Sequence, residues 1–192
     1  MIKQHLAKIT IFAITALSPL VMANDFADII TEHANADVKE WLADPAIINA
    51  IKAQNTTSTA LTQAEIDALD KQWRSEVSST DKAMINAVLN NALSGYLQGK
   101  LAASNGLYTE IFVMDNKGLN VGQSNITSDY WQGDEAKWQD TFMQGANSIH
   151  ISEVEEDEST QTYQSQLSLP VIDPSSQAVI GAITIGINVD AL

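Results

Sequence analysis

The sequence predicts a single α+β domain in which helices come first and a five-stranded antiparallel sheet follows. Three observations support this prediction. Apolar residues recur at three-to-four spacing through the first half of the chain, as the buried stripe of a helix demands. From Tyr108 onward they come in short runs separated by turn sequences, as in strands. The chain has 192 residues, a length that suits one domain with a sizeable core.

The start of the chain predicts a cleaved secretory leader. Lys3 and Lys8 make its start positive, an apolar run extends from Ile9 to Val21, and Ala23 supplies a small side chain for signal peptidase. A retained signal anchor is the alternative, but the run is shorter than the roughly 20 apolar residues that span a bilayer. We therefore expect a leader over 1–23, a single domain over 24–192 and a location in the periplasm.

The composition narrows the function classes. The formal net charge is −14, which argues against nucleic acid and anionic lipid as partners because both require a positive surface. The sequence contains no cysteine, so disulfides, thiolate metal sites and cysteine nucleophiles are excluded. Stability must therefore come from packing.

The predicted helical part covers 24–106. Asp44-Pro45 should end the first helix, because the residue before a proline disfavours the helical region, and a short helix should follow and fade in the polar run after Gln54. Thr62 and Glu65 fit a capping box that begins another helix. One long helix is then expected from Asp81 to Gly106. The stripe of the first helix consists of Phe26, Ile30, Ala34, Val38, Trp41 and Leu42.

The predicted sheet part covers 107–192. An insertion over 126–145, with a short helix over 135–143, separates the first two strands from the other three. In the last strand the bulky residues Ile183, Ile185 and Ile187 share one face, and the opposite face is mostly small, which lets a helix or a ligand approach closely. The five strands are expected at Tyr108–Met114, Leu119–Ser124, Ile149–Val154, Tyr163–Val171 and Val179–Val189.

Three segments in this order resemble the extracellular PAS-like sensor domains known as PDC or Cache domains. Tyr108 to Asp115 followed by Lys117-Gly118 resembles their first hairpin. Ser128 to Trp138 resembles the segment that closes their pocket. Leu167 to Asp173, followed by Ile180-Gly181-Ala182, resembles their pair of late strands.

The resemblance implies a small-molecule sensor or binding domain. Many relatives use an arginine in the pocket segment to hold a ligand carboxylate, whereas this segment offers only Lys137, which weakens the expectation of an amino-acid or organic-acid ligand. Because no transducer is recognised in the sequence, the partner implied is a separate membrane-bound signalling protein. In relatives the N-terminal helix pairs subunits, so a homodimer through that helix is also implied.

We expect the ligand to lie between the insertion and the sheet. Aromatic walls with a few carboxylates would suit a cationic or hydroxylated small molecule. The alternative is an envelope scaffold protein whose groove is filled by its own side chains, with the tryptophans packed on the sheet. The expected ligand-binding residues are Asp129, Tyr130, Trp131, Asp134, Lys137, Trp138, Gln164, Gln166 and Ser168.

No catalytic residues, metal ligands or cofactor are expected. The common nucleophile, zinc and phosphate-loop motifs are absent from the sequence, and the pair Asp129 and Asp134 is what an acidic protein shows by chance. His150 lacks a partner motif for haem, so a surface or hydrogen-bonded histidine is the better interpretation. The acidic run from Glu153 to Glu158 matches no EF-hand and is expected to be a solvated hairpin tip.

Overall fold

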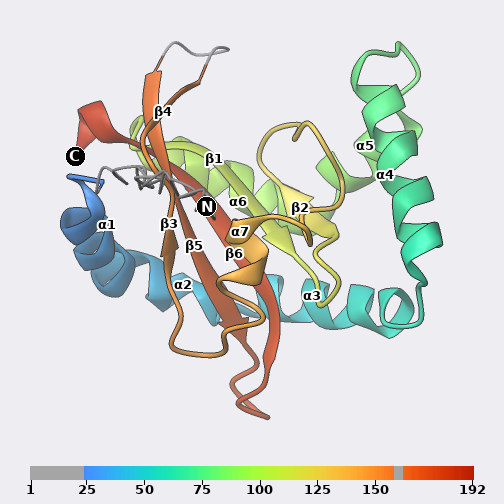
Figure 1. Cartoon of the computed structure of the whole chain (residues 1–192), viewed down its shortest axis with the longest axis horizontal. Coiled ribbons are helices and arrows are strands. Elements are labelled where there is room, and N and C mark those ends of the chain that lie inside the picture. The colour runs from blue at the N-terminus through green and yellow to red at the C-terminus, as the bar shows by residue number, and fades with distance from the viewer. Residues whose placement is uncertain (1–23, 158–161) are drawn as a thin grey trace, which may run out of the picture.

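The computed structural model describes residues 24–157 and 162–192, so the predicted leader lies outside the described residues and stays a prediction. A helical layer precedes an open antiparallel sheet (Figure 1), which confirms the predicted α+β class. The helical elements are α1 (Ala27–His33), the π-helical η1 (Ala34–Val38), α2 (Lys39–Leu42), α3 (Pro45–Ser58), α4 (Gln63–Val77), α5 (Ala83–Leu89), α6 (Ala92–Ala103), the short α7 (Ala136–Gln139) and the 3-10 turn η2 (Val189–Ala191).

The sheet has six strands in the described residues, one more than predicted. Its order is β2-β1-β6-β5-β3, and β4 also pairs with β5. The predicted strand Ile149–Val154 is present only as the two-residue β3, because the Ser152 hydroxyl accepts the hydrogen bond of the Gln166 backbone N–H at 2.8 Å and interrupts the ladder. The additional strand, β4, lies in the acidic run that was expected to form a hairpin tip. The strands are β1 (Tyr108–Met114), β2 (Asn120–Gln123), β3 (His150–Ile151), β4 (Glu155–Asp157), β5 (Thr162–Ile172) and β6 (Val179–Asn188).

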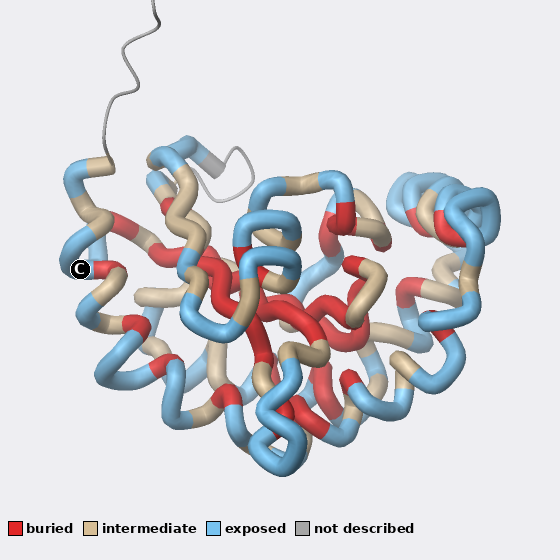
Figure 2. Tube along the Cα trace, turned by 60° about the horizontal axis from the view of Figure 1, so that its bottom comes forward, coloured by how far each residue is buried: buried red, intermediate tan, exposed pale blue. Residues whose placement is uncertain are grey.

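One face of the sheet, which we call the inner face, packs against α1, η1, α2, α3 and α6. Ile183, Ile185 and Ile187 of β6 are fully buried there, as the alternation in the sequence predicts. Figure 2 shows that buried residues concentrate in the central strands and on the sides of the helices that face them. The predicted stripe of the first helix is confirmed, since Ile30, Ala34, Val38 and Leu42 are all buried in this core.

One predicted helix end is confirmed, and one predicted helix is wrong. The helix that follows Pro45 ends at Ser58, within the polar run where it was expected to fade, and Asp44 caps its start by accepting the Ala46 N–H at 2.8 Å. The long helix expected from Asp81 to Gly106 is divided into α5 and α6, because the side chain of Asn91 caps a new helix through the Ser94 N–H at 2.8 Å.

The antiparallel helices α4 and α5 lie beside the β2 end of the sheet (Figure 1). The predicted capping box of α4 is confirmed, with Thr62 and Glu65 each satisfying a backbone N–H of the other. A second core holds this pair of helices in place, and its largest member, Trp73, is fully buried. None of the helices in the described part of the chain is both long and apolar enough to cross a membrane.

Candidate functional site

The face of the sheet opposite the helical layer, which we call the outer face, is polar over much of its area. Ser168 and Thr184 are fully buried there and share a hydrogen bond of 2.9 Å between their hydroxyl oxygens. The Gln166 amide donates to the Glu110 carboxylate at 2.9 Å. Because these residues occupy alternate positions on β1, β5 and β6, their side chains project together from one side of the sheet.

The segment 126–135 covers part of this face and is held by β2. The Asn120 amide donates to the Thr127 hydroxyl at 2.9 Å and to the Asp129 carbonyl at 3.2 Å. Gly118 has a φ of +81°, and a Cβ there would collide with the backbone of Gly133. This close approach requires glycine at 118 and brings the turn after β1 against the segment.

Helix α4 holds the same segment from the other side. Asp70 accepts the backbone N–H groups of Tyr130 and Trp131 at 2.9 and 3.0 Å. Arg74 pairs with Asp70 at 2.6 Å and reaches Asp129 at 3.1 Å, and its hydrogen bond to Asp70 raises the pKa of the guanidinium above its ordinary value. The position of Asp129 is therefore set by a helix about 55 residues earlier in the sequence.

A cavity of about 190 Å³ lies between segment 126–137 and the outer face. Its walls contain both signs of charge. Lys137 lies with its ammonium 5.5 Å from the centre of the Phe112 ring and 2.8 Å from the Glu135 carboxylate. The lining residues are Glu110, Phe112, Ile126, Thr127, Ser128, Asp129, Gln132, Lys137 and Gln166.

Gln132 is the cavity residue with an unmet hydrogen-bonding group. It is 1% exposed, and its amide N–H donates to the Asp129 carboxylate at 2.5 Å. Its side-chain oxygen has no partner, and the same holds for the oxygen of Asn120 and the amide nitrogen of Gln123 nearby in the chain. Buried polar groups are almost always hydrogen bonded to protein, water or a ligand. Of these three residues only Gln132 belongs to the cavity lining, so a polar molecule in the cavity would satisfy its open oxygen.

Three of the nine residues expected at the ligand site line this cavity together: Asp129, Lys137 and Gln166. Gln164 and Ser168 project from the same face but are engaged by Thr109 and Thr184 outside the cavity lining. Asp134 is exposed to solvent.

The aromatic residues of the insertion do not line the cavity. Tyr130 is buried against Trp73, with ring centres 5.4 Å apart, and burial raises the pKa of Tyr130 to about 12. The indole of Trp131 donates to the Lys117 carbonyl at 2.8 Å. The indole of Trp138 donates to the Asp115 carbonyl at 3.1 Å and stacks on Phe142. These rings pack on the protein, and the cavity walls are mostly polar.

Sequence reasoning missed four residues that shape the site. Glu110 was detectable, because it alternates with Phe112 on one face and is the only charged residue of the strand. Gln132 lay within the predicted segment but gave no distinguishing signal. The roles of Asp70 and Arg74 depend on where α4 lies in space, and no local pattern reveals that position.

The residues considered for metal or haem binding do not come together in one site in the described part of the chain. No group of three or more potential metal ligands occurs in residues 24–157 and 162–192. His150 lies 3.4 Å from the Asp140 carboxylate, and His33 contacts Asp37 and Tyr108. Glu153, Glu155 and Glu156 are exposed, while Glu158 lies outside the described residues.

No protein-family model and no curated protein matches this sequence. Several solved structures are similar, and they are sensor domains of the kind that the sequence resembles. The sensor domain of the Vibrio cholerae histidine kinase DctB is 17% identical, with a TM-score of 0.38, over 76% of this chain and 57% of that one.

Two chemoreceptor structures are similar at the same level. The ligand-binding domain of Campylobacter jejuni Tlp3 with 4-methylisoleucine is 12% identical, with a TM-score of 0.38, over 82% of this chain and 62% of that one. The domain of the Pseudomonas aeruginosa amino acid chemoreceptor PctC with GABA is 14% identical, with a TM-score of 0.41, over 80% of this chain and 62% of that one. This chain thus spans less than two thirds of the length of each of these three structures.

Proposed function

We propose that this protein is a periplasmic sensor module that binds a small polar molecule in the cavity beneath segment 126–137. The observation that supports this proposal most directly is Gln132, which lines the cavity, is almost fully buried and has an oxygen without a partner. Leaving such a group unpaired costs about 1–3 kcal/mol. A ligand with a hydrogen-bond donor would recover that cost.

The lining also indicates the chemistry of the ligand. Lys137 supplies a cation to the cavity lining, while Glu110 and Asp129 supply carboxylates. A molecule with both an anionic and a cationic or hydroxyl group would match these walls. With a volume of about 190 Å³ the cavity suits a molecule of amino-acid size. This interpretation revises the expectation from the sequence, which had given less weight to amino acids because of the missing arginine.

We propose that ligand binding changes the position of helices, and that a separate membrane-bound partner detects this change. Asp129 lines the cavity and is also tied to α4 through Arg74, so a ligand that moves Asp129 acts on α4. A ligand can shift this arrangement only if it binds one state more tightly than the other. Ile29 of α1 is 45% exposed, and we propose that this helix carries the contact to a second copy.

The test is a thermal-shift screen with amino acids, GABA, amines, organic acids and nucleosides. A ligand present at about 100 times its Kd stabilises the native state by about 2.7 kcal/mol, which raises the Tm of a domain of this size by roughly 5 to 10 °C. Lys137→Gln and Gln166→Leu should each reduce this shift. Asp134→Asn is the matched control, because it removes an exposed charge from the same segment outside the cavity and should leave the shift unchanged.

A scaffold role is the second candidate, and one observation favours it. Trp138 and Phe142, whose ring centres are 4.8 Å apart, pack on Phe112, Met114 and Ala182 and fill part of the outer face with the protein's own side chains. If no compound class raises the Tm, or if the shift is insensitive to both cavity variants, the scaffold role is supported and the sensor proposal fails.

A further inference from the structure

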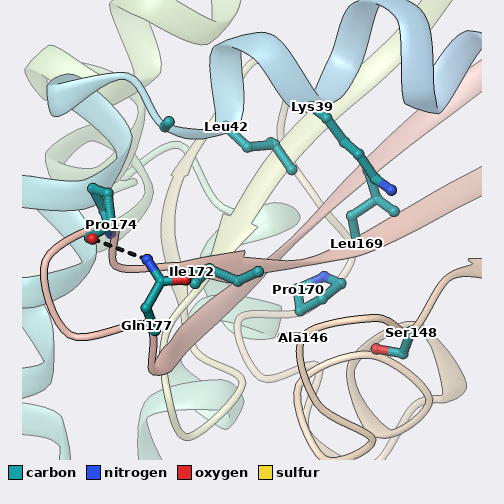
Figure 3. A pocket seen from close by; sticks show the side chains of 10 residues that line it. Lys39, Leu42, Ala146, Ser148, Leu169, Pro170, Ile172, Pro174 and Gln177 are labelled. Atoms are coloured by element: carbon teal, nitrogen blue, oxygen red, sulfur yellow. Dashed lines mark hydrogen bonds between the residues drawn. The ribbon is translucent and has the colours of Figure 1, made fainter.

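A second cavity, of about 280 Å³, lies at the edge of the sheet beside β5 (Figure 3). Lys39 and Leu42 of α2 form one side of it, and β5 forms the opposite side. Its volume is close to the lower end of the range for ligand pockets, which is about 300–1,000 Å³. The lining residues are Lys39, Leu42, Ala43, Ala146, Ser148, Leu169, Pro170, Ile172, Pro174 and Gln177.

The local sequence explains why this space is left open. Helix α2 ends at Leu42 and α3 begins at Pro45, so the non-helical Ala43 between them lines the cavity. On the other side β3 pairs only as far as Ser168, which leaves Leu169 to Ile172 without a strand partner at that edge in the described residues. Pro170 lies in this stretch, and its missing N–H removes a donor that would favour pairing with another strand.

The cavity contrasts chemically with the polar one. Seven of its ten lining residues are leucine, isoleucine, alanine or proline, and the Gln177 amide is engaged by the Pro174 carbonyl at 3.0 Å, as the dashed line in Figure 3 shows. Lys39 is its only charged residue. An occupant must therefore be largely apolar.

Lys39 differs from the lysine of the polar cavity in its partners. Lys137 is already paired with Glu135 at 2.8 Å. Lys39 donates to the neutral amide oxygen of Asn35 at 2.7 Å, and no carboxylate within the described ranges lies within 4 Å of its ammonium. An ammonium has three donors. Lys39 thus presents an uncompensated positive charge at an apolar cavity.

We infer that this cavity binds a small molecule that combines an apolar body with an anionic group. The apolar body lies against Leu42, Leu169 and Ile172, and the anionic group pairs with Lys39. Burial of each methylene of such a molecule contributes about 0.8 kcal/mol, so the apolar walls supply most of the affinity and Lys39 supplies the selectivity for an anion. This site shares no lining residue with the polar cavity, so the two proposals are tested independently.

The experiment compares octanoate, octanol and octylammonium, which share a chain and differ in charge. Binding is followed by NMR titration of backbone amides, which also locates the site. We expect octanoate to give saturable shifts at Leu42, Leu169 and Ile172, with weaker binding of octanol and the weakest binding of octylammonium. Lys39→Gln should weaken octanoate about two- to fivefold, as expected for an exposed ion pair, and should leave octanol unchanged.

Two further variants separate this effect from general ones. Lys71→Gln removes an exposed lysine on α4 and should change none of the three affinities. Ala146→Trp places a large side chain at the exposed rim and should abolish binding of both octanoate and octanol. The inference is overturned if octanoate gives no saturable shifts below its micelle concentration, if the shifts lie around Gln132, or if octylammonium binds as well as octanoate.

Discussion

The two faces of β6 show how one strand serves two purposes. On the inner face Ile183, Ile185 and Ile187 are fully buried against the helical layer. On the outer face the intervening positions are Ala182, Thr184 and Gly186, and polar groups of neighbouring strands gather beside them. The inner face therefore stabilises the fold through apolar packing. The outer face instead carries polar side chains that can form hydrogen bonds.

This difference explains why the polar cavity lies on the outer face of the sheet. Over the central strands the inner face is close-packed against the helical layer, where even one missing methylene is felt, and the apolar cavity lies at the edge of the sheet beside β5. The outer face is covered by a segment that backbone hydrogen bonds and the Asp70–Arg74–Asp129 contacts hold in place. Because this cover does not rely on close apolar packing against Glu110 and Gln166, open space remains beneath it.

Truncation of adjacent residues on the two faces gives the largest expected difference. Ile185→Ala removes a fully buried side chain from the inner core and should cost about 2–5 kcal/mol of unfolding free energy. Thr184→Ala leaves the buried Ser168 hydroxyl without this partner on the outer face and should cost less, about 1–3 kcal/mol. Urea unfolding of the two variants measures both values, and equal costs would show that the two faces are not differently built.

Alanine in place of the two glycines of β6 tests the same contrast by adding an atom. At Gly181, on the inner face, the new Cβ would collide with the Met114 backbone carbonyl oxygen, so the strands must shift. We expect Gly181→Ala to cost about 1–3 kcal/mol, as overpacking does. At Gly186 the atoms in the way belong to the side chains of Thr109, Gln164 and Glu110, which can rotate.

Gly186→Ala should therefore cost less than Gly181→Ala, and thermal unfolding of both variants provides the measurement. A crystal structure or NMR spectrum of Gly186→Ala should show the change confined to the outer face. If Gly186→Ala is the more destabilising of the two, the outer face is as rigid as the inner one, and the contrast between them is lost.

Much of the fold could be predicted because it is encoded locally. The stripe of the first helix, the capping box at Thr62 and the alternation in β6 each depend on residues that are neighbours in sequence. The errors occur where a side chain competes with the backbone. Asn91 starts a new helix inside a continuous apolar pattern, and Ser152 replaces a ladder hydrogen bond in the middle of a predicted strand.

The candidate site was harder to predict because its parts come from distant segments. The insertion over 126–145 was identified, but its aromatic residues Tyr130, Trp131 and Trp138 were expected in the cavity and they pack on the protein instead. A tryptophan has a large apolar surface and one N–H donor. The N–H groups of Trp131 and Trp138 donate to the carbonyls of Lys117 and Asp115, and both rings pack against hydrophobic clusters of the protein. The polar lining depends on Glu110 and on α4, whose contribution only the tertiary structure shows.

The smallest predicted effect concerns a charge contact that ties the inner layer to the sheet. Lys52 of α3 donates to Asp173 at 2.9 Å, where the turn between β5 and β6 begins. This hydrogen bond, followed by those from Ser175, lowers the pKa of Asp173 well below its ordinary value of 3.8. A carboxyl group with a depressed pKa in the folded state contributes stability above its unfolded pKa, and the contribution is lost as the pH falls through the folded pKa.

Lys52→Met should therefore lower stability at pH 7, and the difference from the parent protein should shrink as the pH falls below about 3.8, the ordinary pKa of the group. Urea unfolding at a series of pH values from neutral to acidic measures this difference. Lys71→Met on α4 is the control and should match the parent protein throughout. A deficit of Lys52→Met that stays constant into the acidic range would mean that Lys52 stabilises the layer through its aliphatic chain and not through Asp173. The inner face would then be held by packing alone, in sharper contrast to the outer face.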